Sequence, residues 1–89
     1  MPSANAEIVN KLGLHARAAA KLTHLASGFQ SEIWLSRSGR RVNAKSIMGV
    51  MMLAAGQGTS VLVEAKGDDA EQAIDAIARL VADRFGESE

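Results

Sequence analysis

The residues best suited to chemistry lie between Gly13 and Ala20, where His15 and Arg17 stand among alanines. A histidine imidazole is largely uncharged at neutral pH, and an uncharged ring nitrogen is a nucleophile. A guanidinium two residues further on suits phosphate, which it can bind through two parallel hydrogen bonds. The pair therefore favours a site that accepts a phosphoryl group on His15 and stabilises it with Arg17.

A helix expected over residues 16–27 begins directly after His15, which places His15 at the N-cap. Ser, Thr, Asp or Asn usually caps a helix by accepting a hydrogen bond from its first turn, and histidine does this poorly. We therefore expect the backbone N–H groups of Ala16, Arg17 and Ala18 to stay open for an anion such as phosphate. Arg17 supports this expectation. A cation in the first turn interacts unfavourably with the helix dipole, at a cost of about 0.3–1 kcal/mol, and its presence there is explained if an anion binds beside it. The alternative is that His15 and Arg17 are ordinary solvated residues.

A second, shorter helix is expected over residues 47–53, with Ser46 as its N-cap and Gly56 as its end. Val50 and Leu53 are the expected core residues of this helix. Its methionines either fill the core or form an adaptable surface for several partners. The expected docking patch and its basic rim, which we place beside His15, comprise Ile47, Met48, Met51, Arg17, Lys45 and Lys21.

Hydrophobic periodicity predicts four strands and one further helix. The expected strands cover residues 7–10, 31–36, 40–44 and 59–65. Ser38-Gly39 is a turn signal between two of them, Gly28 should end the first helix, and Asp68 with Glu71 resembles a capping box for the third. The apolar face of the third helix comprises Ile74, Ile77, Ala78, Val81 and Phe85, and residues 86–89 should fray.

The order β-α-β-β-α-β-α predicts an α+β fold. We expect an open-faced two-layer sandwich, in which three helices cover one face of a four-stranded, mainly antiparallel sheet. The other face should be partly wet, since Glu32 and Glu64 alternate with apolar residues. The 89 residues contain no linker or repeat and make a single domain over residues 1–89.

Composition excludes several classes of protein. Ten Lys/Arg and ten Asp/Glu give a formal net charge of zero, so nucleic acid is not an expected partner. The absence of cysteine excludes disulfides, cysteine–zinc sites and a thiol nucleophile. His24 lies about 180° around the helix from His15, so we expect no metal site there and a surface position for His24.

The distribution of charge is uneven. Residues 1–45 hold seven Lys/Arg and two Asp/Glu, a net +5, and residues 46–89 hold three and eight, a net −5. This indicates either a face for an anionic ligand or acidic partner, or two halves that neutralise each other.

The first ten residues lack the regions of a signal peptide, and no apolar stretch approaches the ~20 residues of a membrane helix. We expect a cytoplasmic monomer with no membrane insertion.

The segment from Gly13 to Ala20 resembles the active-site signature of the histidine-containing phosphocarrier (HPr) family of the bacterial sugar phosphotransferase system. Residues 45–53, Lys-Ser-Ile-Met-Gly-Val-Met-Met-Leu, resemble the second, seryl signature of that family, and the likeness spans nearly the whole chain. One position departs from the pattern, because the family usually has proline where this chain has Ala18. Alanine restores a backbone donor and loosens the first turn. Residues 10–13 are also similar to the nitrogen-related branch of the system.

The resemblance implies that enzyme I, charged by phosphoenolpyruvate, phosphorylates His15 on Nδ1, and that His15 passes the group to a histidine of an enzyme IIA domain. Arg17 would stabilise the transferring charge. It also implies phosphorylation of Ser46 by an HPr kinase/phosphorylase. The protein would be a stoichiometric carrier without cofactor or metal, not an independent enzyme. The alternatives are a small regulatory or interaction module of the same fold, in which His15 is dispensable, and a regulator that reads only Ser46.

Overall fold

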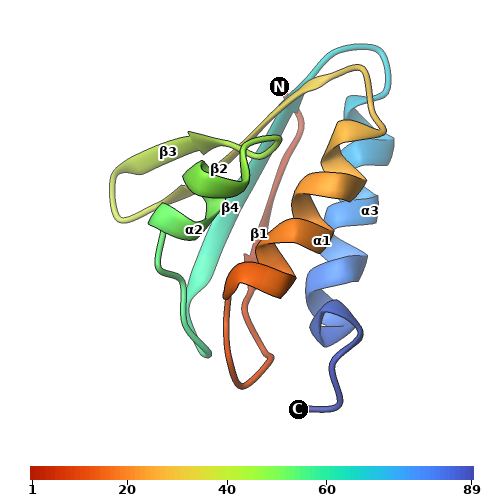
Figure 1. The fold of residues 1–89 in the computed structure, drawn as a ribbon. Helices are drawn as coiled ribbons and strands as arrows, with labels where there is room; N and C mark the ends of the chain where they lie inside the picture. The colour runs from red at the N-terminus through yellow and green to blue at the C-terminus, as the bar shows by residue number, and fades with distance from the viewer.

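Four strands form one antiparallel sheet in the order β1-β4-β2-β3 in the computed structural model, which describes residues 1–89 (Figure 1). The strands are β1 (Ser3–Glu7), β2 (Glu32–Arg37), β3 (Arg40–Asn43) and β4 (Ser60–Lys66). Leu35 of β2 stands opposite both Val63 of β4 and Val42 of β3. Because side chains alternate along a strand, this register gathers the apolar side chains on one face of the sheet.

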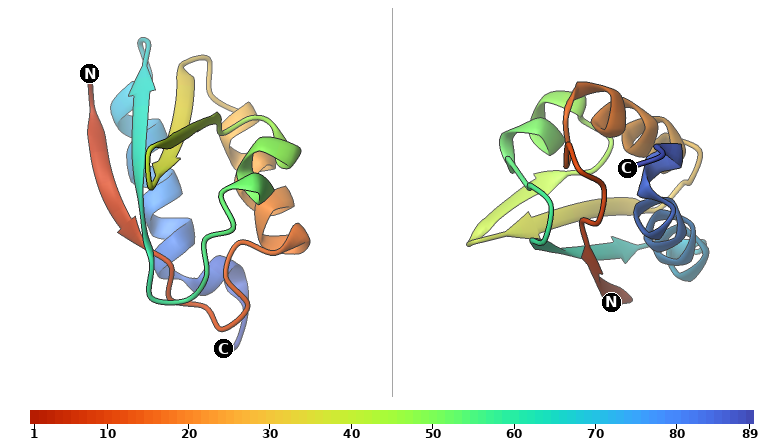
Figure 2. Two further views of the ribbon diagram at one scale, coloured as in Figure 1. Left: turned by 90° about the vertical axis from the view of Figure 1, so that its left-hand side faces the viewer. Right: turned by 90° about the horizontal axis from the view of Figure 1, so that it is seen from below.

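Three helices cover that face, which confirms the predicted α+β sandwich (Figure 2). They are α1 (Ala16–Ser27), α2 (Ile47–Met52) and α3 (Ala70–Ala82), and a short 3₁₀ turn, η1 (Arg84–Gly86), follows α3. Gly28 caps the end of α1 as expected. None of the helices is both long and apolar enough to cross a membrane. The largest fully buried side chains between the layers are Phe85, Ile8, Leu22, Ile33, Leu35 and Ile77.

The β2–β3 hairpin and the open face of the sheet also match the expectations. Ser38 and Gly39 both have positive φ, 53° and 80°, as a two-residue hairpin turn requires. On the open face, the guanidinium of Arg41 lies 4.2 Å from the ring centre of Trp34 and its Nε lies 3.6 Å from Oε1 of Glu64. Glu32 is exposed. This face is therefore partly polar and in contact with water.

The prediction of the first strand over residues 7–10 was wrong, because β1 lies earlier, at Ser3–Glu7. The inward side chains of β1 are Ala4 and Ala6, which stand opposite Val63 and Val61. Two alanines give almost no hydrophobic alternation, so the apolar pair Ile8-Val9 dominated the pattern. Ile8 is fully buried, but it lies where the chain leaves the sheet toward His15.

The end of the second helix also differs from the expectation that Gly56 terminates it. α2 stops at Met52, and Ala54 adopts a positive φ of 50°. Two arginines from the β2–β3 hairpin bind the carbonyls at this end: Arg37 Nη1 donates to Leu53 O at 3.0 Å and Arg40 Nη1 donates to Met52 O at 2.8 Å. Long-range donors thus take the place of a local glycine cap.

The capping box predicted at Asp68 was wrong. Asp69 holds the N-cap of α3, and its side chain makes no capping bond. Its carboxylate instead accepts hydrogen bonds from the backbone N–H groups of Gln30 and Ser31 and from Ser31 Oγ. These bonds hold its pKa below the usual range, the Ser31 hydroxyl having the largest effect. Asp69 therefore ties the start of α3 to the segment that leads into β2.

Residues 86–89 do not fray as predicted. The chain leaves the α-helix at Arg84 and Phe85, which have positive φ of 57° and 55°, and this turn places Phe85 in the core with no exposed surface. Lys21 Nζ donates to Phe85 O at 2.6 Å, and Lys11 N donates to Glu89 O at 2.7 Å. The C-terminal segment is thereby fixed beside the start of α1.

Candidate functional site

His15 occupies the N-cap of α1 without capping it. Its φ and ψ are −74° and 177°, and its side chain makes no capping hydrogen bond. The backbone N–H groups of Ala16, Arg17 and Ala18 have no hydrogen-bond partner in the protein, as predicted from the poor cap. Ala16 and Arg17 are exposed, whereas Ala18 is buried. The start of α1 therefore presents unpaired N–H groups, of which those on Ala16 and Arg17 belong to exposed residues.

The turn before His15 fixes its position. Gly13 has a φ of 66°, and a Cβ there would lie 2.5 Å from the carbonyl oxygen of Ala55. Leu14 follows with its side chain buried, and its N–H donates to the same carbonyl at 2.9 Å. A positive φ and a close backbone approach together require glycine. These contacts anchor the residues that lead into the helix, so His15 lies on a rigid support.

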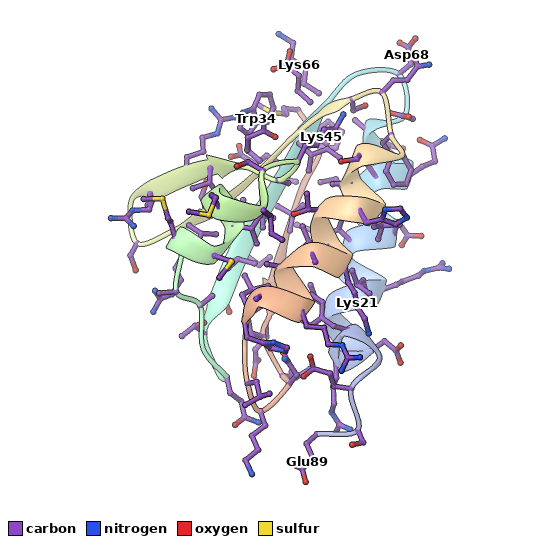
Figure 3. The ribbon with its side chains drawn as sticks, viewed as in Figure 1. Lys21, Trp34, Lys45, Lys66, Asp68 and Glu89 are labelled. Carbon is purple, nitrogen blue, oxygen red and sulfur yellow. The ribbon has the colours of Figure 1, made fainter.

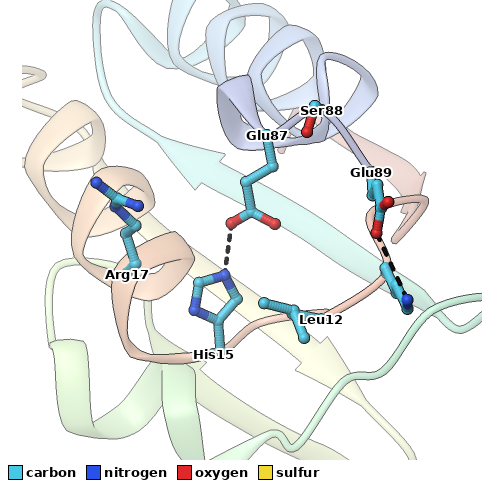
Figure 4. Close-up of a pocket in the computed structure, with 7 residues that line it drawn as sticks. Leu12, His15, Arg17, Glu87, Ser88 and Glu89 are labelled. Carbon is cyan, nitrogen blue, oxygen red and sulfur yellow. Dashed lines mark hydrogen bonds and ion pairs between the residues drawn. The ribbon is translucent and has the colours of Figure 1, made fainter.

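The imidazole of His15 is held by a residue from the other end of the chain (Figure 4). Its Nε2 lies 2.5 Å from Oε2 of Glu87, and Nδ1 makes no hydrogen bond within the protein. The bond from His15, followed by one from Asn10, lowers the pKa of the Glu87 carboxyl. An ionised carboxylate can only accept hydrogen bonds. The proton of the neutral ring therefore belongs on Nε2, and the lone pair belongs on Nδ1.

A buried asparagine steadies this pair. Asn10 has no exposed surface, and its Nδ2 donates to Oε1 of Glu87 at 3.0 Å and to Gly13 O at 2.9 Å. It thus links the carboxylate to the glycine turn that carries His15. The side chains of His15 and Glu87 are 27% and 17% exposed, so the ring is neither packed away nor free in solvent.

A pocket of about 310 Å³ lies over the ring (Figure 4). Its lining residues are Lys11, Leu12, His15, Arg17, Glu87, Ser88 and Glu89. Arg17 is exposed and forms neither a hydrogen bond nor an ion pair with the protein. A nucleophilic nitrogen, an unpaired guanidinium and unpaired N–H groups therefore lie together, and such an arrangement can bind a transferring phosphoryl group.

His24 lies elsewhere. It is an exposed residue in the last turn of α1, as expected. No group of three or more His, Cys, Asp or Glu side chains is placed to hold a metal ion.

The second signature also forms a cap. Ser46 Oγ accepts a hydrogen bond from the N–H of Gly49 at 3.1 Å, as predicted. Val50 and Leu53 of this region point into the core, with 0% and 3% exposure. The exposed apolar side chains of α2 are Ile47, Met48, Met51 and Met52. α2 therefore presents a solvent-facing apolar surface rather than filling the core with its methionines.

The two lysines of the predicted rim lie in different places (Figure 3). Lys45 Nζ donates to Phe29 O at 2.7 Å, just beyond the end of α1 that is opposite His15. The 12 residues of α1 extend over roughly 18 Å, so this ammonium is far from the imidazole. Lys21, by contrast, is bound to the C-terminal segment near Glu87. The structure thus brings Arg17 to His15 and separates Lys45 from it.

Sequence reasoning missed two residues of this site, Asn10 and Glu87. Asn10 was included in the expected first strand, and Glu87 in the segment expected to fray. Neither has a local signal, because Glu87 meets Asn10 and His15 across 77 and 72 residues of chain. Only the folded arrangement of the C-terminal segment brings them together.

Comparisons with known proteins agree with this geometry. The family model described as "PTS HPr component phosphorylation site" matches residues 2–83. The chain is similar to phosphocarrier protein HPr of Cupriavidus necator, with 62% identity over 82 residues that cover 92% of each chain. It is 47% identical to phosphocarrier protein NPr of Shewanella violacea over 81 residues, covering 91% of this chain and 89% of that one. A crystal structure of HPr from Thermoanaerobacter tengcongensis superposes with a TM-score of 0.96 at 48% identity, covering 100% of both chains.

Proposed function

Because this chain belongs to the HPr family of the phosphotransferase system and is a phosphocarrier, we propose that it carries its phosphoryl group on Nδ1 of His15. The observation that supports this is the ring's environment. Nδ1 has no protein partner, while Nε2 is engaged by Glu87. Nδ1 is thus the ring nitrogen with a lone pair available to attack phosphorus.

Three groups stabilise the charge of the transferring phosphoryl. The guanidinium of Arg17 has no ionic partner in the protein, and the N–H groups of Ala16 and Arg17 point outward from the helix start. The N–H of Ala18, on a fully buried residue, is a fourth donor at the same helix start. As the bond from phosphorus to the donor breaks and the bond to Nδ1 forms, these groups bind the phosphoryl oxygens.

The partners follow from the family. Enzyme I, charged by phosphoenolpyruvate, is the donor, and a histidine of an enzyme IIA domain is the acceptor, with both exchanges in the cytoplasm. The docking patch consists of Ile47, Met48 and Met51, which are 40%, 68% and 39% exposed. Arg17 supplies positive charge beside His15, whereas the ammonium of Lys21 is bound to Phe85 O, on the η1 side of α1 (Figure 3). The protein acts as a stoichiometric intermediate rather than an independent enzyme.

Ser46 is a regulatory phosphosite in this proposal, served by an HPr kinase/phosphorylase. Its hydroxyl is half-buried and caps α2 directly before the exposed Ile47 and Met48. A phosphate there adds roughly −1.5 to −2 charges. Such a charge would weaken docking of an acidic partner on the patch while keeping an acceptor at the cap.

The test uses the two histidines of the chain as a matched pair. The protein is incubated with phosphoenolpyruvate and enzyme I, and mass spectrometry measures the number of acid-labile phosphoryl groups. One group is expected on the wild type and on His24→Ala, and none on His15→Ala with an unchanged circular dichroism spectrum. A phosphoryl group retained by His15→Ala would refute the assignment. Absence of any adduct on the wild type would favour the interaction module instead.

A further inference from the structure

The carboxylate of Glu87 is fixed on both sides. Oε2 contacts Nε2 of His15 at 2.5 Å, and Oε1 accepts a hydrogen bond from the fully buried Asn10 at 3.0 Å. The backbone around it is fixed as well, because Phe85 is buried in the core and Lys21 binds its carbonyl. A carboxylate held in this way restricts the ring it contacts, both in orientation and in the placement of its proton.

Resting on the function proposed above, we propose that Glu87 is a positioning residue for phosphoryl transfer, which holds the proton of His15 on Nε2 so that Nδ1 faces the phosphoryl group with its lone pair. A neutral imidazole has one N–H and one acceptor nitrogen. If the proton moved to Nδ1, the nucleophile would be lost at the position beside the start of α1. Glu87 opposes this tautomer because its carboxylate has no proton to donate to Nε2.

The same contact balances charge after transfer. When phosphorus leaves the donor and bonds to Nδ1, the proton on Nε2 stays in place, and the imidazole ring gains positive charge. The carboxylate of Glu87 lies against that N–H and not against the phosphoryl oxygens, which bind on the Nδ1 side. Passing the group to the acceptor reverses these changes, so one fixed carboxylate serves both half-reactions.

Glu87 comes from the C-terminal segment, beyond residue 83, where the match to the family model ends. Its two partners, Asn10 and His15, lie within the matched region. Glu71 provides the control, because it is an exposed glutamate of α3 that makes no ion pair or side-chain hydrogen bond and does not line the pocket over His15.

The experiment compares wild type, Glu87→Ala, Glu87→Gln and Glu71→Gln by two measurements. Nitrogen NMR of labelled, unphosphorylated protein reports the tautomer of His15, and rapid-mixing kinetics with phosphorylated enzyme I reports the transfer rate and the KM. The wild type and Glu71→Gln should show the Nε2–H tautomer and equal rates. Both Glu87 variants should show a mixture of tautomers and a transfer rate reduced by about tenfold or more, with little change in KM.

The outcomes distinguish the positioning role of Glu87 from the carrier role of His15. If Glu87→Ala and Glu87→Gln keep the wild-type tautomer and the wild-type rate, Glu87 is not a positioning residue, although His15 remains the carrier. A rise in KM alone would also refute the inference, since it would indicate a role in docking. The tautomer measurement needs no phosphorylation, so a wild type that takes up no phosphoryl group would refute the proposed function separately. Glu87→Gln, which preserves the shape of the side chain, guards against a variant that loses its fold.

Discussion

Gly13→Ala should both destabilise the protein and impair the site. The position has a φ of 66°, and the new Cβ would lie 2.5 Å from Ala55 O and 2.9 Å from Gly56 Cα. The left-handed conformation costs a non-glycine residue about 1–2 kcal/mol, and the clash with backbone adds about 1–3 kcal/mol. Reduced freedom of the unfolded chain offsets about 0.4–1 kcal/mol. The net loss is therefore about 1–4.6 kcal/mol in the free energy of unfolding.

Two other glycines separate these contributions. Gly58 has a φ of 88° but nothing within 4 Å of an added Cβ, so Gly58→Ala should show the conformational cost alone, about 0–1.6 kcal/mol after the offset. Gly56 has neither a positive φ nor a close neighbour, so Gly56→Ala should be close to neutral. The difference between Gly13→Ala and Gly58→Ala measures the clash with the segment around Ala55.

Urea unfolding followed by circular dichroism provides these values, and enzyme I kinetics tests the functional half. Because Gly13 supports His15 through Leu14, the alanine variant should transfer more slowly even where it is fully folded. Its melting temperature should fall by about 4–8 °C for each kcal/mol lost. If Gly13→Ala is no less stable than Gly58→Ala, the close approach to Ala55 does not constrain the turn, and the argument for a rigid support of His15 fails.

Met48→Glu should slow transfer from enzyme I without lowering the melting temperature, because this side chain is 68% exposed; kinetics and melting curves on one preparation check both, and unchanged kinetics would contradict the docking patch. Ser46→Ala should cost about 1 kcal/mol in urea unfolding through loss of the bond from Gly49, and Ser46→Thr should retain most of it. The lowered pKa of Asp69 means that its contribution to stability is complete above the ordinary value of 3.8 and is lost as the pH falls through the lower folded pKa. Asp69→Asn should therefore flatten the fall of the melting temperature below about pH 4, while the exposed Asp68→Asn should not.

The features predicted correctly from sequence are those with local causes. The open helix start at His15 and the cap at Ser46 each depend on residues within one turn of helix. The same holds for the Ser38-Gly39 turn, whose two positive φ values are set by the dipeptide itself. A single sequence is sufficient for such features, because backbone geometry and the first hydrogen bonds are decided by neighbours in the chain.

The features that sequence reasoning missed depend on distant partners. β1 escaped detection because its inward residues are alanines, whose burial depends on the valines of β4. Asp68 was expected to cap the third helix, but the N-cap is Asp69, whose carboxylate binds a segment 38 residues away. Lys45 was placed beside His15 by its proximity to α2 in sequence, whereas its ammonium binds Phe29 O. In each case a tertiary contact replaced the local one that the pattern suggested.

The positions of the two chain ends affect how the protein can be handled in the laboratory. Met1 is 67% exposed and its end of β1 lies at the edge of the sheet far from the pocket, whereas Glu89 lines the pocket over His15 (Figures 1 and 4). An affinity tag, fluorophore or surface linker attached before Met1 should leave exchange with partner proteins undisturbed. The same label attached after Glu89 would begin beside the reactive ring and should alter the kinetics it was meant to report.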